Sequence, residues 1–505
     1  WQLSSILSNL ESDGTYGAAA QAWNAEVTAA YEYSSDAKNT TPSSGGTSGN
    51  EAAKSLVLTV GQDVLTGSAF ADFFRGVAGV QVGLQDQTTL NSSDILDGGE
   101  GVDTLIVNLT GPNYIGGARI KNIDTLQLGT NIVAATFDYN VNQGQNEITE
   151  VTTIVADQIN QANGVNEDLT INNILKTGND LPLIHWKNEA GSVAGEVDVN
   201  YRASAVAGAT TQGIKLENVA ANIVAASSGV LNVAAGVETF EIESAGAGNT
   251  LNNHETQQTA NAAGTFVDLA SGTGSLTKVV VKGSASFGKT ANVIDTVTDA
   301  NHGQTNRAVG SDLGNNVATA TARADSSNLV SLAHSVLEYD ASQATGAQAV
   351  RFTPNATAST GANVIFKGGS AADYAEFELG NINANGGAGD DTFAFVNALA
   401  NSTFGESDSM NGGDGSDTIQ IGLNGANTFN ISETELRNKT SFGTIDLRGN
   451  TNNLTLSSDF VAAADTANSI TVRTDKIIQV SDTSTANTAA NAGGTGNGLE
   501  DASTN

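Results

Sequence analysis

Three nine-residue segments of this chain repeat one arrangement of glycine and aspartate. Gly386 to Ala394 (GGAGDDTFA), Gly98 to Ile106 (GGEGVDTLI) and Gly412 to Gln420 (GGDGSDTIQ) all fit G-G-x-G-x-D-x-U-x, in which U is a large apolar residue. Because glycine has no Cβ atom and takes positive φ readily, the pattern predicts sharp turns whose carbonyl oxygens point inward. The aspartate at the sixth place adds a carboxylate to each turn.

Such an oxygen-rich turn suits a hard divalent cation. Calcium binds six to eight oxygen atoms at roughly 2.3–2.6 Å, more than one short turn supplies. A second turn must therefore stack on the first, which makes the spacing between copies informative. The alternative interpretation is a tight turn that carries a surface aspartate and binds no ion.

Two further segments keep part of the pattern. Gly368 to Glu376 (GGSAADYAE) retains both leading glycines and Asp373 but has alanine at the fourth place, and it begins two full nonapeptides before Gly386. Gly67 to Phe74 (GSAFADFF), with Asp72, is the weaker candidate partner of the copy at Gly98. Both segments are therefore candidate neighbours of complete copies.

Composition limits the classes of function. The 505 residues suffice for about three domains and a large core without disulfides, and the chain has no cysteine and one methionine, which suits an exported protein. Acidic residues outnumber basic ones 54 to 21, and the net charge of −33 argues against binding nucleic acid or an anionic membrane. Bound divalent cations would reduce this self-repulsion. No apolar run in the chain is long enough to predict a membrane span.

The turns are positioned by short β-branched segments, which predict strands from Ser55 onward. Examples are LVLTV at Leu56, TLIVNLTG at Thr104, LTKVVVKG at Leu276 and ANVIFKG at Ala362. A second pattern places an acid beside alternating strand residues, at Ile123-Asp124, Val237-Glu238 and Ile445-Asp446. Its irregular spacing indicates rungs of a β-solenoid with loops of variable length and a narrow core filled by small residues.

The two ends differ from the middle of the chain. In residues 1–38, Trp1, Leu3, Ile6 and Leu10 share one helical face, and Ala19, Trp23, Val27 and Tyr31 repeat that spacing. Two short helices are expected there, packed on the first β coil or on an upstream part, or alternatively carrying a separate binding function. The predicted division is a helical segment at 1–38, a flexible linker at 39–54, a β-solenoid region with the first calcium motif at 55–350, a calcium-binding β-roll region at 351–480 and a polar tail at 481–505.

These motifs resemble a known family. The passage LVLTVGQDVLTGSAFADFF, followed by LNSSDILDGGEGVDTLIVNL, resembles the repeats-in-toxin (hemolysin-type) calcium-binding β-roll family. In texture it is similar to the surface-layer and adhesin-like proteins that Gram-negative bacteria export by type I secretion. The close resemblance covers roughly residues 55–130 and 362–422. Scattered motifs instead of a long tandem array favour a structural surface protein over a toxin.

The resemblance implies an all-β fold, a calcium-binding β-solenoid or β-roll with a short N-terminal helical segment. In the family two nonapeptides make one coil, so Asp373 should lie directly above Asp391. The longer step from Gly386 to Gly412 is interpreted as one coil plus an eight-residue bulge through Glu406 and Asp408. The candidate calcium-binding residues are Asp72, Gly98, Gly99, Gly101, Asp103, Asp373, Gly386, Gly387, Gly389, Asp391, Gly412, Gly413, Gly415 and Asp417.

Other chemistry has little support in the sequence. Gly283 to Thr290 (GSASFGKT) matches a phosphate-binding loop, but the β-branched sequence after it does not predict the helix that such a loop opens. The four histidines are scattered, without the spacing of a zinc protease. The chain is therefore predicted not to be an enzyme, although a catalytic domain outside these residues is a third alternative.

The predicted function is extracellular and structural. We expect a calcium-dependent protein at the cell surface that assembles with copies of itself into a bacterial surface layer or fibre. The partners are then calcium, further copies in a lattice or filament, and cell-surface polysaccharide as a candidate anchor. The alternative is the stalk or recognition module of a type I secreted adhesin.

Overall fold

The computed structural model describes residues 52–500, apart from several gaps. The longer gaps are 80–87, 140–147, 221–229, 252–275, 289–292, 295–307, 310–329, 353–362, 396–403, 422–427 and 483–498. The expected helices in residues 1–38 and almost all of the expected linker lie outside the described residues. No helix among the described residues is long and apolar enough to cross a membrane.

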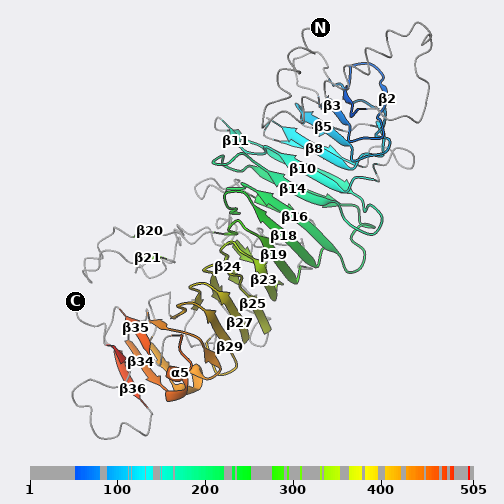
Figure 1. Ribbon diagram of the computed structural model, residues 1–505. Coiled ribbons are helices and arrows are strands. Elements are labelled where there is room, and N and C mark those ends of the chain that lie inside the picture. The colour runs from blue at the N-terminus through cyan, green and yellow to red at the C-terminus, as the bar shows by residue number, and fades with distance from the viewer. Residues whose placement is uncertain are drawn as a thin grey trace, which may run out of the picture.

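One long parallel sheet extends through most of the described chain (Figure 1). Successive strands of this sheet come from successive passes of the chain, as expected for a solenoid. In spatial order it contains β1 (Ser55–Val57), β3 (Phe73–Ala78), β5 (Thr104–Leu109), β8 (Thr125–Thr130), β10 (Thr153–Asp157), β14 (Leu183–Lys187), β16 (Thr211–Glu217), β18 (Thr239–Ala245), β19 (Lys278–Gly283), β23 (Glu338–Ala344), β25 (Asn363–Lys367), β27 (Asn381–Ala388), β29 (Ser409–Asp414) and β32 (Lys439–Thr440).

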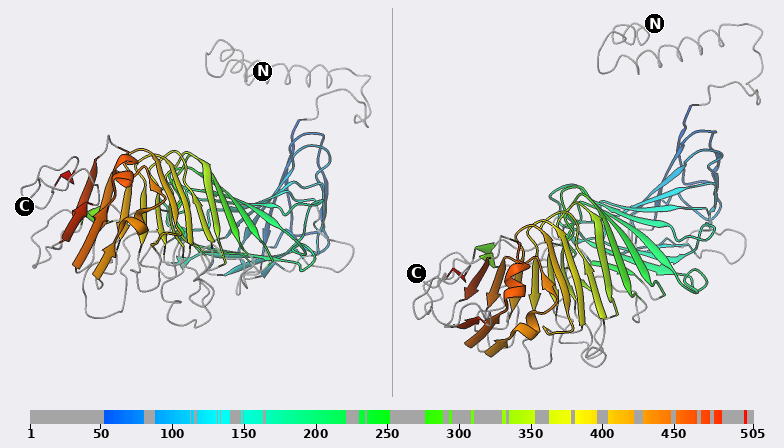
Figure 2. Two further views of the ribbon diagram at one scale, coloured as in Figure 1. Left: turned by 90° about the horizontal axis from the view of Figure 1, so that it is seen from below. Right: turned by 60° about the horizontal axis from the view of Figure 1, so that its bottom comes forward.

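Between these passes the chain forms shorter parallel sheets, and the coils stack into an elongated, twisting body (Figure 2). The first two of these sheets are β2 (Val64–Thr66), β4 (Ile95–Asp97) and β7 (Arg119–Lys121), then β6 (Asn113–Tyr114), β9 (Ala135–Asp138), β13 (Asp168–Ile174), β15 (Glu196–Tyr201) and β17 (Val230–Val233). The next is β22 (Val330–Leu332), β24 (Ala349–Phe352), β26 (Tyr374–Phe377), β28 (Thr392–Phe395), β30 (Thr418–Ile421), β33 (Thr444–Leu447), β35 (Ile470–Thr474) and β37 (Leu499–Glu500). The last is β31 (Thr428–Ile431), β34 (Thr451–Leu456) and β36 (Ile478–Asp482).

The remaining described elements are small. Two antiparallel pairs, β11 (Gln161–Ala162) with β12 (Val165–Asn166) and β20 (Val293–Ile294) with β21 (Ala308–Val309), stand apart from the parallel sheets. Two short helices, α4 (Glu433–Leu436) and α5 (Ser458–Ala462), belong to the last coils. The long sheet continues from β23 to β25 across the boundary that the sequence predicted between residues 350 and 351. Strand β37 lies within the segment expected to be a polar tail.

The core lies between the long sheet and the sheets opposite, where every second residue of a strand points inward. In β5 and β8 the buried positions pair in register, Leu105 with Leu126 and Val107 with Leu128. The strand segments predicted at Leu56, Thr104, Leu276 and Ala362 correspond to β1, β5, β19 and β25. The mostly β, parallel, solenoid-like architecture predicted from the sequence is therefore confirmed.

The prediction of a core filled mainly by small residues is wrong for the coils between residues 339 and 395. Because parallel strands pair in register, equivalent residues lie above one another, and here several of them are aromatic. The ring centroids of Phe352 and Phe377 lie 5.4 Å apart, and those of Phe377 and Phe395 lie 5.7 Å apart. Phe366 and Phe393 meet edge to face at 5.8 Å.

Coil lengths vary widely along the solenoid. Asp373 and Asp391, which are hydrogen-bonded across one coil, lie 18 residues apart. Asp391 and Asp417 make the same contact 26 residues apart, and the extra residues of that coil lie between β28 and β29. Both coil steps expected for the segment from Gly368 to Gln420 are therefore confirmed. A much longer coil separates Lys278 from its strand partner Glu338.

The three acid-containing segments do not occupy equivalent places. Asp124 and Glu238 immediately precede β8 and β18 of the long sheet, and the carbonyl of each accepts amides of the next coil. Asp446 instead lies inside β33, in the opposite sheet. The three segments thus belong to rungs of the solenoid at different places, in line with the variable loop lengths expected from their irregular spacing.

Candidate metal centre

The motif turns form two groups at opposite edges of the long sheet. Asp72 and Asp103 immediately precede strands β3 and β5, so the first group lies where strands of the long sheet begin. Gly386 and Gly412 lie near the ends of β27 and β29, and their turns lead out of these strands. The second group therefore lies where strands of the long sheet end. Because all strands of this sheet are parallel, the two groups lie at different edges.

Within each group the aspartates stack in a row. In the first row, which we define as Asp72, Asp103 and Asp124, the amide of Asp72 donates to Asp103 Oδ1 at 2.7 Å. The amide of Asp103 in turn donates to Asp124 Oδ2 at 2.8 Å. Each carboxylate therefore links its own coil to the previous one.

The second row consists of Asp373, Asp391, Asp417 and Asp465. The amide of Asp373 donates to Asp391 Oδ1 at 2.7 Å, and the amide of Asp391 donates to Asp417 Oδ1 at 2.7 Å. The predicted position of Asp373 directly above Asp391 is confirmed. The same geometry also places Asp72 against Asp103, as the weaker pairing predicted.

One oxygen of each carboxylate in the complete nonapeptides has no hydrogen-bond partner. The three residues Asp103, Asp391 and Asp417 are at most 1% exposed, and the Oδ2 atom of each is buried and unpaired. A buried ionised oxygen without a partner is strongly unfavourable. Each of these oxygens therefore favours a proton, a bound water molecule or a cation beside it.

A carbonyl oxygen of the next coil converges with each unpaired oxygen. A Cβ atom added to Gly386 would lie 2.2 Å from Asp391 Oδ2 and 2.2 Å from the carbonyl oxygen of Gly412. For Gly412 the corresponding distances are 2.3 Å to Asp417 Oδ2 and 1.9 Å to the carbonyl oxygen of Ser441. Only glycine fits beside such converging oxygens, which are the ligand type that calcium prefers.

The copy at Gly98 has the same construction. A Cβ atom on Gly98 would lie 2.5 Å from Asp103 Oδ2 and 1.8 Å from the carbonyl oxygen of Asn122. The second and fourth glycines adopt the left-handed conformation, with φ of +96° at Gly99 and +122° at Gly101. The pattern recurs at the glycines of the other complete copies, Gly387, Gly389, Gly413 and Gly415.

Burial shifts the acidity of these groups. Burial and then the neighbouring carboxylates raise the pKa of Asp391 to about 8. Burial likewise raises the pKa of Asp417 to about 6, and that of Asp103 above its usual range. At neutral pH a cation that binds Asp391 must therefore displace its proton, so binding there is coupled to pH.

The incomplete turns differ from the complete ones. Asp373 accepts from the amide of Gln348 at 2.6 Å on one oxygen and from the amide of Gly369 at 2.7 Å on the other. Both oxygens of Asp72 are also hydrogen-bonded, to Lys54 and Ser68. These two candidate ligands lie where the sequence predicted, but their oxygens already have donors.

Three residues that the sequence did not single out complete the rows. Where another motif follows, as after Gly386, the carbonyl oxygen of its first glycine faces the turn; after Gly98 and Gly412 the carbonyl oxygens of Asn122 and Ser441 take this position. Both residues have positive φ, +54° and +57°. Asp465 Oδ2 accepts from the amide of Asp417 at 2.8 Å, 48 residues away. The Asp465 side chain lies beside Gly443, and a Cβ atom added to this glycine would lie 2.9 Å from Asp465 Oδ2.

No nonapeptide marks these three residues. The asparagine at 122, beside the acid-containing segment at Ile123, is the one signal that could have been used, because asparagine tolerates the left-handed conformation better than most residues. Ser441 and Asp465 carry no comparable signal.

Asparagine occupies a comparable place in the middle of the solenoid. Asn249 Oδ1 accepts from the amide of Val219 at 2.8 Å, as the motif aspartates accept from the previous coil. Its Nδ2 donates to the carbonyl oxygens of Leu216 at 3.1 Å and Ala245 at 2.9 Å. An amide group thus supplies there the positive partner that the complete nonapeptides lack.

Each candidate site has few carboxylates. Among the described residues no three Asp, Glu, His or Cys side chains converge on one point. A cation at a complete turn would be held by the motif carboxylate together with carbonyl oxygens of two coils. These residues fit calcium, because a bound ion would contact the unpaired carboxylate oxygen of one coil and a carbonyl oxygen of the next and so link the two coils.

The segment that matches a phosphate-binding loop belongs to the coil. Gly283 ends β19, and Phe287 is fully buried and bridges to both Asn249 and Gln348. Lys289 and Thr290 lie outside the described residues. The described part of the segment thus serves the solenoid core.

Comparisons with protein-family models, with curated proteins and with solved structures gave no match.

Proposed function

We propose that this protein is an extracellular structural β-solenoid whose coils are linked by calcium and which associates with copies of itself in a surface layer or fibre. The observation that carries the proposal is the unpaired, buried Oδ2 of Asp103, Asp391 and Asp417, each facing a carbonyl oxygen of the next coil. A divalent cation there satisfies both oxygens and joins two coils.

The expected stabilisation is large. A ligand that binds only the folded form adds about 2.7 kcal/mol when its concentration is a hundred times its Kd. Three such sites would contribute about 8 kcal/mol, which is comparable to the whole stability of an ordinary domain, roughly 5–15 kcal/mol. Calcium would therefore decide whether the coils around both aspartate rows are ordered.

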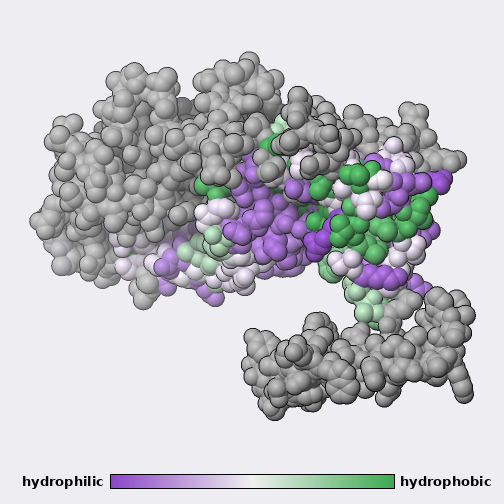
Figure 3. All heavy atoms as spheres, turned by 90° about the horizontal axis from the view of Figure 1, so that it is seen from above, coloured by the Kyte–Doolittle hydropathy of each residue, from purple (hydrophilic) through white to green (hydrophobic). Residues whose placement is uncertain are grey.

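The surface available for association lies at the first coil. Among the described residues β1 is the terminal strand of the long sheet, and none of them pairs with its outer edge, which could accept a further strand. The view onto this end shows apolar residues gathered beside polar ones (Figure 3). The large apolar side chains at this end that are 40–69% exposed are Val57, Val60, Val64, Phe70, Phe73 and Val102.

A second copy is the occupant that suits this end. Parallel solenoids extend by adding a coil in register, and the exposed apolar side chains would be buried by doing so. The net charge of −33 opposes the approach of two copies. Calcium bound at the turns lowers that charge, which makes association depend on the same ion as folding.

The test is a calcium titration of chelated protein, followed by circular dichroism, light scattering and electron microscopy, with magnesium as the control ion. Strand signal and particle size should rise together with calcium and hardly with magnesium. The double substitution Val57→Lys with Val64→Lys should reduce particle size without changing the number of bound calcium ions. Asn363→Lys with Asn383→Lys adds the same charge on exposed positions elsewhere and should leave assembly intact.

A protein that is fully folded in chelator and stays monomeric at millimolar calcium would contradict the assembly proposal. It would favour the second candidate function, a stalk or recognition module of an adhesin.

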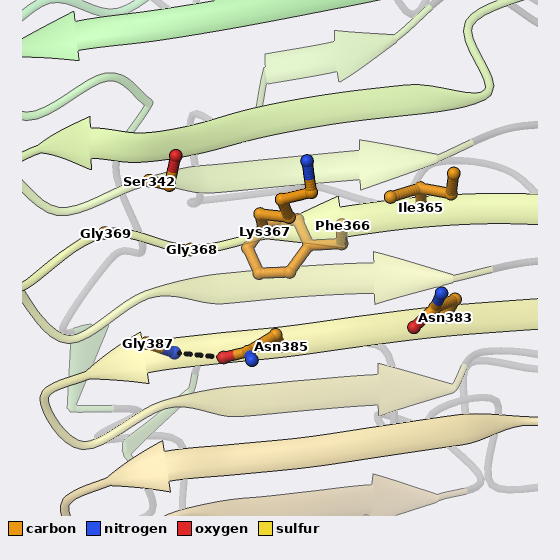
Figure 4. Close-up of a pocket in the computed structure, with 9 residues that line it drawn as sticks. All are labelled: Ser342, Ile365, Phe366, Lys367, Gly368, Gly369, Asn383, Asn385 and Gly387. Carbon is orange, nitrogen blue, oxygen red and sulfur yellow. Dashed lines mark hydrogen bonds between the residues drawn. The ribbon is translucent and has the colours of Figure 1, made fainter.

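One observation supports that second candidate. A groove of about 400 Å³ lies over β25 and β27, and the polar residues among those that line it are Lys367, Asn383, Asn385 and Ser342 (Figure 4). Amide, hydroxyl and ammonium groups on an open surface suit a polysaccharide, which offers many hydroxyl partners. Binding of cell-surface polysaccharide that is lost in Asn383→Ala would support this role, and unchanged binding would exclude the groove.

A further inference from the structure

We infer that, of the five motif turns in the described part of the chain, only the three complete nonapeptides bind cations, and that the turns at Gly67 and Gly368 are closed without an ion by their own backbone amides. This inference refines the proposed function, because it assigns which turns respond to calcium. It rests on contacts that differ between two kinds of turn with nearly the same sequence.

In the incomplete turns the second residue donates to its own aspartate. The amide of Gly369 donates to Asp373 Oδ2 at 2.7 Å, and the amide of Ser68 donates to Asp72 Oδ2. The other oxygen of each aspartate accepts from the preceding part of the chain. The carboxylate oxygen that a cation would need is therefore already hydrogen-bonded to this amide.

Other buried aspartates of this protein are satisfied in the same way. Asp94 accepts from the amides of Asp63 at 2.9 Å and Asn91 at 2.8 Å, one on each oxygen. Asp408 accepts from Ile382 at 2.9 Å and Gly405 at 2.7 Å, again one on each oxygen. Two amides thus close both of these aspartates, whereas the aspartates of the complete nonapeptides, like Asp465 with its unpaired Oδ1, lack the second donor.

In the complete turn at Gly386 the amide of the second glycine is directed elsewhere. Gly387 donates to Asn385 Oδ1, one residue before the motif, at 3.0 Å (Figure 4). Asp97 holds the equivalent place before Gly98, and Lys121 and, more weakly, the amide of Gly99 lower the pKa of its carboxyl group. The residue before the incomplete turns is Thr66 or Lys367, neither of which carries a carboxylate or amide oxygen.

The fourth residue of the motif sets this difference. Gly101, Gly389 and Gly415 all have positive φ, and a Cβ atom on Gly389 would lie 2.5 Å from the backbone of Ala371. The incomplete turns have Phe70 or Ala371 at this place, where neither residue has positive φ. A Cβ atom makes the left-handed conformation costly. The turn therefore closes differently, and the second amide meets the aspartate.

The two kinds of turn are ordered along the chain. Each group begins with a turn that needs no ion, at Gly67 or Gly368, and the cation-binding turns follow it. The first cation-binding turn of each group thus stacks on a neighbour that is already closed. Calcium then extends order from that neighbour to the following coils, at Asn122 in the first group and at Gly412 and Ser441 in the second.

The closing experiment compares Asp373→Asn with Asp391→Asn, two buried members of one row. Asp391→Asn should reduce the calcium count from three to two, and it should raise the melting temperature in chelator, because its Nδ2 replaces an unpaired oxygen beside a carbonyl. Asp373→Asn should leave the count at three and lower the melting temperature in chelator, because its Nδ2 faces the amide of Gly369. Calcium would be counted by calorimetry and by elemental analysis.

The outcomes separate the two levels of argument. Wild-type protein that binds no calcium would overturn the proposed function, whereas equal loss of one ion in both variants would overturn this inference alone. If Asp373→Asn does not fold, the double substitution Lys367→Asn with Ala371→Gly tests the same point. It should create a fourth site, with Lys367→Asn alone as the control that stays at three. A count of three in the double variant would also refute the inference.

Discussion

Replacing Asn249 by aspartate should reproduce, in the middle of the solenoid, the unpaired carboxylate of the complete turns. Asn249 is fully buried, and its Nδ2 donates to the carbonyl oxygens of Leu216 and Ala245 and to the hydroxyl oxygen of Ser244 at 2.8 Å. Its Oδ1 accepts from the amide of Val219 and would keep that bond after substitution. The change therefore removes donors and leaves the fold's other contacts in place.

The magnitude follows from those contacts. A buried acceptor that loses its donor costs about 1–3 kcal/mol, and two carbonyl oxygens lose theirs in Asn249→Asp. The new carboxylate oxygen also faces those same carbonyls. We expect a loss of about 3–6 kcal/mol in the free energy of unfolding at pH 8 in chelator, a large share of an ordinary domain's stability.

The assay is urea unfolding followed by circular dichroism in chelator and in calcium, with hydrogen exchange of β16 and β18 as a local readout. Asn363→Asp, at an exposed position of β25, is the matched control and should change stability by less than about 0.5 kcal/mol. Calcium should restore part of the stability lost in Asn249→Asp, because the site then offers the oxygens of a complete turn. A loss below about 1 kcal/mol in chelator would refute the reasoning that an amide replaces the cation at this place.

Three further predictions concern the second group of turns. The pKa of Asp391 is about 8 in the folded state without cations, so between about pH 4 and pH 8 the folded state binds a proton that the unfolded state has released. The free energy of unfolding should therefore fall as pH rises through this range, by at most about 1.4 kcal/mol per pH unit. Thermal melts in chelator check this, and the slope should decrease in Asp391→Asn. Gly412→Ala should displace the next coil and remove one calcium ion, because the added Cβ would lie 1.9 Å from the carbonyl oxygen of Ser441; an unchanged calcium count would contradict the assigned geometry. Lys439→Met should destabilise the protein by about 2–4 kcal/mol in urea unfolding, because the buried ammonium donates to three carbonyl oxygens, whereas Lys367→Met at a half-exposed ion pair should cost less than about 1 kcal/mol.

The sequence alone determined the local chemistry and the short-range register. The spacing of Gly368, Gly386 and Gly412 predicted the lengths of two successive coils, and the strands pair with those same steps, Asn363 with Asn381 and Asn383 with Ser409. This succeeds because a glycine that carries positive φ has few substitutes, so the turn is encoded in adjacent residues. The β-branched segments likewise identify strands without knowledge of their neighbours.

Tertiary structure decided which oxygens meet and which stay free. Asn122, Ser441 and Asp465 join the rows through loops of unequal length, and the contact from Asp417 to Asp465 spans 48 residues. Whether a motif aspartate keeps a free oxygen depends on where the second amide points, as at Gly369 and Gly387. That direction is fixed by backbone torsions and by the neighbouring coil together, so a pattern of residue types predicts the turn but not the state of its carboxylate.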